Sequence, residues 1–143
     1  MPLHPKVLIV DDNEVMRTLL RGILRNEVYQ IIGEARNGTL ALQFIERSKP
    51  DIVIMDVMMP EMDGLEALQN IKEKNPEIVV VMITGNPSVD IVQESIHGGA
   101  SGFIIKPFNS AKVLDTLDRA WQTRKIPVPP MDSTAPKLEQ RDD

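Results

Sequence analysis

Three aspartates that could do chemistry follow two short apolar runs of this chain. The run VLIV at residues 7–10 leads directly into Asp11 and Asp12, and the run IVIM at residues 52–55 leads into Asp56. A buried strand explains each apolar run, but it does not explain the carboxylates at its end. In open α/β folds, ligands bind beyond the carboxyl ends of the strands. We therefore expect the three acids to form one anionic cluster at an edge of a sheet.

Carboxylates this close together repel one another unless a cation lies between them. Two unit charges about 4 Å apart interact by about 4 kcal/mol in an intermediate dielectric. A hard divalent cation would relieve that repulsion. Mg²⁺ takes one or two protein carboxylates and keeps waters or phosphate oxygens as its other ligands. The acid cluster therefore predicts a Mg²⁺ site.

Two further strand ends add a hydroxyl and an ammonium group. Thr84 follows the apolar run at residues 78–83, and Lys106 follows the run at residues 103–105. A metal ion and a lysine can neutralise the oxygens of a phosphoryl group, and a threonine hydroxyl can donate a hydrogen bond to them. Singly, these residues are explained as turn or surface residues. Together with a nucleophilic aspartate, they predict that Asp56 accepts a phosphoryl group.

The elements that must position these residues are five apolar runs alternating with five amphipathic stretches. Their alternation predicts a parallel sheet with right-handed crossovers, and unbroken apolar strands are typical of a sheet covered on both faces. In the first helix, apolar residues from Val15 to Leu24 recur at helical spacing and are expected to face the sheet. The predicted strands are 6–10, 29–35, 52–55, 78–83 and 103–105, and the predicted helices are 13–26, 39–47, 65–74, 88–97 and 110–123.

Composition narrows the class of protein further. The chain has 143 residues, no cysteine and a net charge of -5, which excludes thiol chemistry and argues against direct nucleic-acid binding. No apolar stretch approaches the length of a membrane span, so we expect a cytoplasmic protein without membrane insertion. We expect one domain at residues 1–124 and a proline-rich, disordered tail at residues 125–143.

Taken in order, these motifs resemble the response-regulator receiver domain, and the layout is most similar to stand-alone, chemotaxis-type receivers. The resemblance covers about residues 6–123. It implies an α/β fold of the flavodoxin-like type, a three-layer sandwich with five helices and a five-stranded parallel sheet of order 2-1-3-4-5. The matching pieces are VDDN at 10–13, MDVMMP at 55–60, MDG at 62–64, TG at 84–85, GA at 99–100 and FIIKPF at 103–108.

The resemblance also implies roles for the acids. Asp56 would accept its phosphoryl group from a sensor histidine kinase or a phosphotransfer protein. Asp12 would bind Mg²⁺ directly, Asp11 would bind it through water, and the main-chain carbonyl of Met58 would complete the protein ligands. Asn86 and the Met58 side chain flank the crevice and are expected to tune the lifetime of the aspartyl phosphate.

By the same resemblance, Thr84 and Lys106 would hold the phosphoryl oxygens, and the Lys106–Pro107 peptide is expected to be cis. Thr84 would move on phosphorylation and Phe103 would turn inward after it. Many receivers have tyrosine where this chain has Phe103, so the inward state would rest on packing without a hydroxyl. The face Ser88–Thr123 would then change its affinity for a downstream protein.

The predicted function is a phosphorylation-dependent single-domain switch, which is not an enzyme beyond its own phosphorylation and dephosphorylation. A phosphotransfer intermediate or phosphate sink in a phosphorelay is an alternative, as is a degenerate receiver that takes no phosphate. Homodimerisation is left open. An alternative of another class is a Mg²⁺-dependent phosphatase of the haloacid-dehalogenase type. Such enzymes need an acid two residues after the nucleophile, where this chain has Met58.

Overall fold

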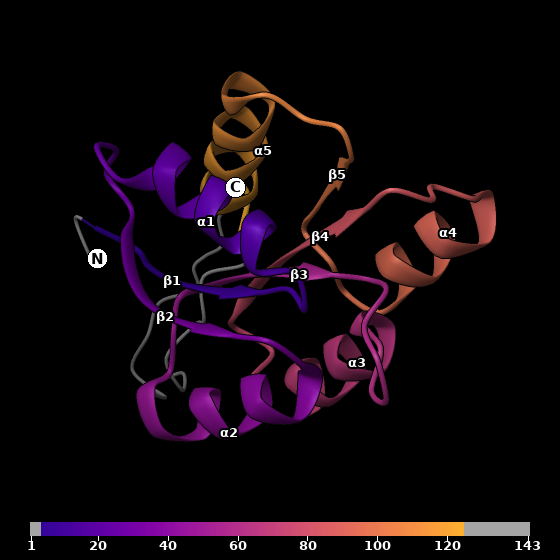
Figure 1. Ribbon diagram of the computed structural model, residues 1–143. Coiled ribbons are helices and arrows are strands. Elements are labelled where there is room, and N and C mark those ends of the chain that lie inside the picture. The colour runs from indigo at the N-terminus through magenta and orange to yellow at the C-terminus, as the bar shows by residue number, and fades with distance from the viewer. Residues whose placement is uncertain (1–3, 125–143) are drawn as a thin grey trace, which may run out of the picture.

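Five strands and five helices alternate along the chain (Figure 1). The computed structural model describes residues 4–124, so the predicted tail at 125–143 lies outside the described residues. The sheet is parallel throughout and has the order β2-β1-β3-β4-β5, which confirms the predicted topology. The elements are β1 (Lys6–Val10), α1 (Glu14–Leu24), β2 (Gln30–Ala35), α2 (Gly38–Ser48), β3 (Ile52–Asp56), α3 (Gly64–Lys74), β4 (Val79–Thr84), α4 (Val89–His97), β5 (Gly102–Ile105) and α5 (Ser110–Gln122).

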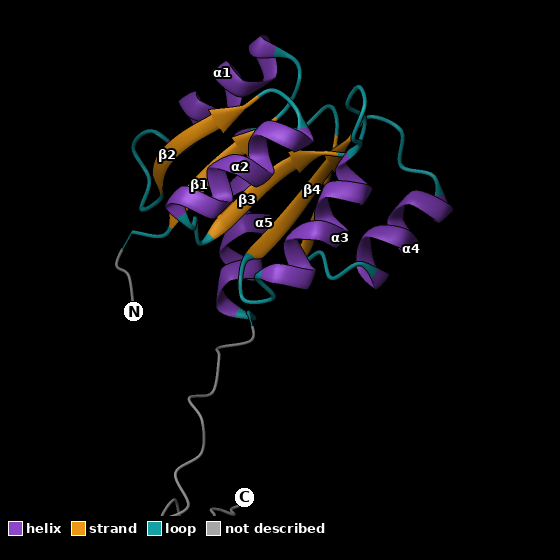
Figure 2. Cartoon of the chain, turned by 90° about the horizontal axis from the view of Figure 1, so that it is seen from below, coloured by secondary structure: helices purple, strands orange, loops and turns teal. Residues whose placement is uncertain are grey.

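The helices cover both faces of the sheet and give the predicted three-layer sandwich. Helices α1 and α5 lie on one face, and α2, α3 and α4 lie on the other (Figures 1 and 2). Strand β3 supplies Ile54 to the α1/α5 core and Val53 to the opposite core, and both side chains are fully buried. Because both faces are covered, β3 and β4 are apolar at every position before their last residue, and β1 is apolar from Val7 to Val10.

Edge strand β2 contains an irregularity at Gly33. Val7 pairs with Ile31, but the next residue of β1, Leu8, pairs with Gly33, so β2 carries one extra residue here. A Cβ atom on Gly33 would lie 2.4 Å from the ring of Phe44. The glycine thus lets the aromatic ring of α2 close over the bulge.

The prediction for the apolar stripe of α1 is partly wrong. Leu20 and Leu24 are buried, whereas Val15 is 74% exposed and Leu19 is 44% exposed. At 3.6 residues per turn, the stripe from Val15 to Leu24 spans an arc of about 180°, but a helix on a core needs only about 100° of apolar surface. One edge of the stripe therefore packs against the sheet and the other edge faces solvent.

Capping side chains fix where the helices begin. Asn13 accepts a hydrogen bond from the backbone N–H of Met16, and Asp63 accepts one from that of Glu66. Such caps satisfy N–H groups that have no partner within the helix. Helices α1 and α3 therefore start directly after the loops that follow β1 and β3. Within residues 4–124, none of the helices has the length and apolar character needed to span a bilayer.

Candidate functional site

The three predicted acids come together at the carboxyl edge of the sheet. Asp56 is the last residue of β3 and pairs with Ile83 of β4, while Asp11 and Asp12 follow β1 directly. Each acid offers a carboxylate oxygen, and these three oxygens lie within 4.8 Å of one another. Strand pairing between β1 and β3 is what aligns the two carboxyl ends.

Asp56 is a buried acid, and burial disfavours its ionised form. Its side chain is 6% exposed, and its Oδ2 lies 3.5 Å from the Nζ atom of Lys106. Burial and the negative charge of Asp11 raise the pKa of Asp56 to about 6, although Lys106 and the Met58 N–H act in the opposite direction. The Met58 N–H donates to Oδ1 over 3.4 Å. The positive charge of Lys106 therefore does not fully offset the effects that disfavour the ionised Asp56 carboxylate.

Asp11 is also buried, and its side chain is firmly held. Its Oδ1 accepts the Asn13 N–H at 2.8 Å, and its Oδ2 lies 3.4 Å from Lys106 Nζ. Burial raises the pKa of Asp11, while these two partners lower it. Its own main-chain N–H donates to the carbonyl of Ala35 in β2 at 3.0 Å.

The donor set of the cluster fits Mg²⁺. It offers only oxygen atoms, which are the ligands that this ion prefers. Asp11 and Asp56 are buried with raised pKa values, and Asp12 is exposed to solvent. A divalent cation would offset the repulsion that raises the pKa of Asp56 and still meet water on the Asp12 side.

Lys106 reaches both buried acids from the end of β5. Its main-chain N–H donates to the carbonyl of Thr84 at 2.8 Å, which holds the start of the loop against β4. The Lys106–Pro107 peptide is cis. The side chain is 21% exposed and forms ion pairs with Asp11 and Asp56. The lysine thus lies beside the acids that it was predicted to join.

Thr84 ends β4 and is completely buried. Its Oγ1 accepts a hydrogen bond from the Asn86 N–H at 3.1 Å. In the part of the chain that the structure describes, no hydrogen bond joins this hydroxyl to Asp56. Thr84 is therefore at the predicted edge of the sheet, with its hydroxyl engaged in the turn that leads to α4.

The other residues predicted around the crevice differ in exposure. Phe103 on β5 is half-buried and packs against the core cluster on the α2/α3/α4 side. Met59 is buried, but the adjacent Met58 is 58% exposed. Asn86 is exposed as well. Both exposed residues lie in the loops that follow β3 and β4.

Two residues that contact the site carried no predicted role. A Cβ atom on Gly64 would lie 2.2 Å from the carbonyl oxygen of Asp56, so only glycine lets α3 start this close to β3. The signal was the glycine directly after the capping Asp63. Arg17 donates from Nη1 to the carbonyl of Asp11 at 2.6 Å. Nothing in the helix pattern distinguishes this arginine from others on the surface.

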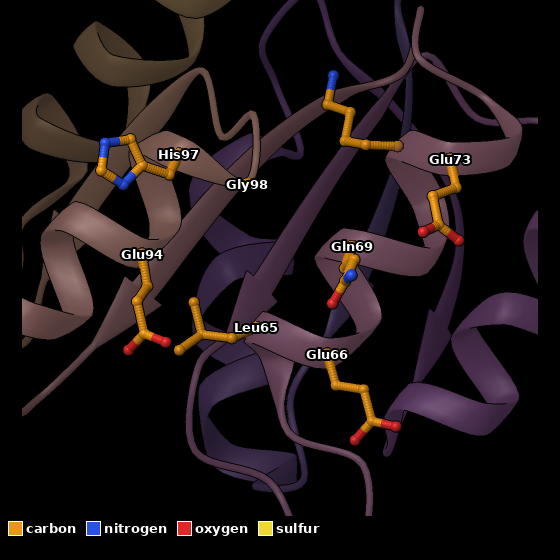
Figure 3. A pocket seen from close by; sticks show the side chains of 8 residues that line it. Leu65, Glu66, Gln69, Glu73, Glu94, His97 and Gly98 are labelled. Atoms are coloured by element: carbon orange, nitrogen blue, oxygen red, sulfur yellow. The ribbon is translucent and has the colours of Figure 1, made fainter.

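A separate groove of about 640 Å³ lies between α3 and α4, away from the acid cluster (Figure 3). Within residues 4–124, the cluster of Asp11, Asp12 and Asp56 is the group of acids or histidines close enough to share a metal ion. None of these three acids lines the groove. The groove is lined by Leu65, Glu66, Gln69, Lys72, Glu73, Glu94, His97 and Gly98.

Comparisons with known proteins agree with this geometry. The family model of the response regulator receiver domain matches residues 7–118, and the chain belongs to that family. It is similar to the chemotaxis protein CheY of Listeria monocytogenes, with 43% identity over 115 residues that cover 80% of this chain and 97% of the relative. It is also similar to CheY of Thermotoga maritima, at 39% identity over 80% of this chain and 95% of the relative.

A solved structure of a related protein has the same fold. The chemotaxis protein CheY4 of Vibrio cholerae superposes with a TM-score of 0.77 and 32% identity, covering 82% of this chain and 98% of that one. The resemblance predicted from the sequence motifs and the flavodoxin-like architecture are both confirmed.

Proposed function

We propose that Asp56 of this receiver domain accepts a phosphoryl group from a histidine kinase or a phosphotransfer protein in a Mg²⁺-dependent reaction. The observation that carries the proposal is the setting of the Asp56 carboxylate, which lies 3.5 Å from Lys106 Nζ and next to the carboxylates of Asp11 and Asp12. Buried acids with raised pKa values cluster at functional sites.

The chemistry is a displacement at phosphorus. A carboxylate oxygen of Asp56 forms the new bond to phosphorus as the bond to the donor's imidazole nitrogen breaks, and that nitrogen keeps the electron pair. The product on Asp56 is an acyl phosphate. Lys106 offsets the negative charge of the phosphoryl oxygens, and Thr84 donates its hydroxyl hydrogen to one of them.

The metal would be held by oxygen ligands of this edge of the sheet. Asp12 would bind it directly, Asp11 would bind it through water, and the Asp56 carboxylate and the Met58 carbonyl would complete the protein ligands. When bound, Mg²⁺ supplies positive charge to the phosphoryl oxygens.

The phosphoryl group carries about -1.5 to -2 charge, which replaces the single negative charge of the ionised Asp56 carboxylate. Thr84 then leaves its hydrogen bond to the Asn86 N–H and moves toward the phosphoryl group, and Phe103 turns into the space that is freed. The face Ser88–Thr123 consequently changes its affinity for a downstream protein. Because Phe103 has no hydroxyl, packing alone holds its inward position.

Met58 and Asn86 set how readily water reaches the acyl phosphate, since both are exposed beside the crevice. Met58 cannot transfer a proton, which favours a lasting signal over a phosphatase intermediate. Transfer onward within a phosphorelay remains the second form of this function. In this proposal the receiver domain occupies residues 1–124, and the protein works in the cytoplasm, where it meets its kinase.

Intact mass spectrometry after incubation with acetyl phosphate and Mg²⁺ tests the acceptor. One phosphoryl group should be added to the unmodified protein and none to the Asp56→Asn variant. Asp51→Asn is the matched control, because Asp51 lies at the opposite end of β3, where its carboxylate accepts the Lys6 N–H at 2.8 Å. That variant should be labelled as the unmodified protein is.

Two results would contradict the proposal. The first is no adduct at any Mg²⁺ concentration, which would support a degenerate receiver. The second is an adduct that persists in Asp56→Asn. Turnover of many phosphate esters per molecule would point to the phosphatase instead.

A further inference from the structure

Arg17 of α1 connects the loop after β1 to edge strand β2. Its Nη1 donates to the main-chain carbonyl of Asp11 at 2.6 Å, and its Nε donates to Oε1 of Glu34 at 3.0 Å. The Arg17 side chain is 15% exposed and that of Glu34 is 25% exposed, so both are well shielded from solvent. Arg21, one turn further along α1, pairs with the other carboxylate oxygen of Glu34.

The carbonyl that Arg17 contacts lies where β1 ends and the following loop begins. It belongs to the peptide plane that joins Asp11 to Asp12, just beyond the last residue of β1. The N–H of Asp11 is still bonded to β2, through Ala35, but the strand has ended by the following peptide. An orientation set on this plane is therefore passed directly to the backbone of Asp12.

We propose that Arg17, oriented by Glu34, is a positioning residue for the Mg²⁺ site. It fixes the peptide between Asp11 and Asp12 and thereby the direction in which the two acids project. The inference rests on the proposed function, because it assumes that these acids bind Mg²⁺.

The choice of arginine follows from geometry. A guanidinium is planar and rigid and donates in several fixed directions, whereas a lysine ammonium is a flexible point donor. Arg17 uses two of these directions at once, one toward Glu34 and one toward the Asp11 carbonyl. The cation that pairs with the buried acids themselves is Lys106. Arg17 therefore acts through geometry and not as a counter-ion of the acids.

Calorimetric titration of Mg²⁺ into the unphosphorylated protein tests this role. Partners that orient metal ligands typically contribute about 10- to 100-fold to metal affinity, and we expect Arg17→Met to weaken Mg²⁺ binding by about 10-fold. Glu34→Gln, which keeps the size of the side chain, should weaken it by a smaller factor. Arg21→Met is the matched control: it removes a partner of Glu34, and within residues 4–124 Arg21 forms no hydrogen bond with Asp11. It should bind Mg²⁺ within about twofold of the unmodified protein.

A second readout separates positioning from general stability. The Mg²⁺ concentration for half-maximal phosphorylation by acetyl phosphate should rise in Arg17→Met, while the rate at saturating Mg²⁺ stays close to that of the unmodified protein. In the metal-free protein, the Asn13 amide, which is bonded to the Asp11 carboxylate, should exchange its hydrogen faster in Arg17→Met than in Arg21→Met.

Equal Mg²⁺ affinity in Arg17→Met and the unmodified protein would overturn this inference alone, as would an equal loss in Arg21→Met. If Arg17→Met does not fold, an unchanged affinity in Glu34→Gln overturns it. Failure of the unmodified protein to bind Mg²⁺ would overturn both this inference and the proposed function.

Discussion

The two flanks of the acid cluster are built differently. The anchored flank consists of α1, β2 and the loop after β1, and there the main-chain N–H, the carbonyl and the carboxylate of Asp11 each have a partner. The switch flank consists of Thr84, α4 and Phe103. Helix α4 buries only Ser95 among its described residues, and that hydroxyl donates within the helix to Ile91.

In the proposed function, this difference separates two tasks. The anchored flank would set the geometry of the acids before any ligand binds, which would lower the cost of organising a metal site. Helix α4 of the switch flank has little buried apolar surface to lose, so its rearrangement would cost little, as expected for elements that move. Val89 and Ile96 of α4 are 70% and 62% exposed, and their apolar surface is available to another protein.

Truncating the apolar anchor of each flank should give the largest contrast. Leu20 of α1 is 1% exposed within the α1/α5 core, while Ile91 of α4 is only half-buried. We expect Leu20→Ala to lower the free energy of unfolding by about 3 kcal/mol and Ile91→Ala by about 1 kcal/mol. Urea denaturation of both variants measures this, and equal losses would remove the distinction between the flanks.

Gly64 lies at the junction of β3 and α3, where it packs against the backbone of Asp56. Gly64→Ala would place a methyl group 2.2 Å from the Asp56 carbonyl oxygen, a backbone atom that cannot move aside easily. We expect a loss of about 2 to 3 kcal/mol in unfolding free energy and weaker Mg²⁺ binding.

Gly22→Ala is the control for this prediction. Gly22 lies within α1 and a Cβ atom there would meet nothing within 4 Å. Alanine in a helix is favoured over glycine by about 0.5 to 1 kcal/mol, so this variant should be more stable than the unmodified protein. Losses of similar size in both variants would mean that the close approach at Gly64 does not matter.

The charge on Asp56 should make the metal-free protein less stable as the pH rises. The pKa of Asp56 is raised from 3.8 to about 6 in the folded chain, so the folded chain resists ionisation between these values. Relative to Asp56→Asn, the unmodified protein should lose up to about 3 kcal/mol as the pH increases from about 4 to about 7. Below about pH 3 the difference in stability between the two proteins should no longer change with pH, because the carboxyl is protonated in both folded and unfolded chains.

Urea denaturation of both proteins at several pH values, in the presence of a chelator, measures this effect. Saturating Mg²⁺ should reverse it at pH 7 by stabilising the unmodified protein selectively. A gap that grows as the pH falls would contradict the raised pKa.

Thr84→Ala should have a modest effect on stability and a specific effect on the switch flank. Loss of the hydroxyl removes the acceptor of the Asn86 N–H, at a cost of about 1 kcal/mol. Phosphorylation of Asp56 should still occur. Hydrogen exchange of α4 and β5 should respond less to phosphorylation than in the unmodified protein, and an unchanged response would exclude Thr84 from the relay to Phe103.

The sequence predicted those parts that depend on local pattern. Apolar runs located the strands, and alternation with helices then placed Asp11, Asp56, Thr84 and Lys106 at one edge of the sheet. The third strand extends one residue further than predicted, because Asp56 still pairs with Ile83 of β4.

Contacts set by long-range pairing could not be predicted in the same way. Arg17 meets Glu34 only because β2 lies beside β1 with a one-residue shift at Gly33, and no local pattern reports that register. The exposure of Val15 and Leu19 depends on which arc of α1 the sheet covers. Such features require the packed structure.

The position of Asp56 inside a strand has a consequence for how it can be modified. Its neighbours Met55 and Val57 are 0% and 2% exposed, and the Val57 N–H is bonded to Ile83, so the segment cannot leave the sheet and extend into a partner's groove. A partner therefore cannot recognise Asp56, the proposed acceptor, as part of an extended linear motif. A peptide of residues 51–60 should not be phosphorylated by the donor that phosphorylates the folded chain. The extent of phosphorylation of a sample should therefore report the fraction of molecules that are correctly folded.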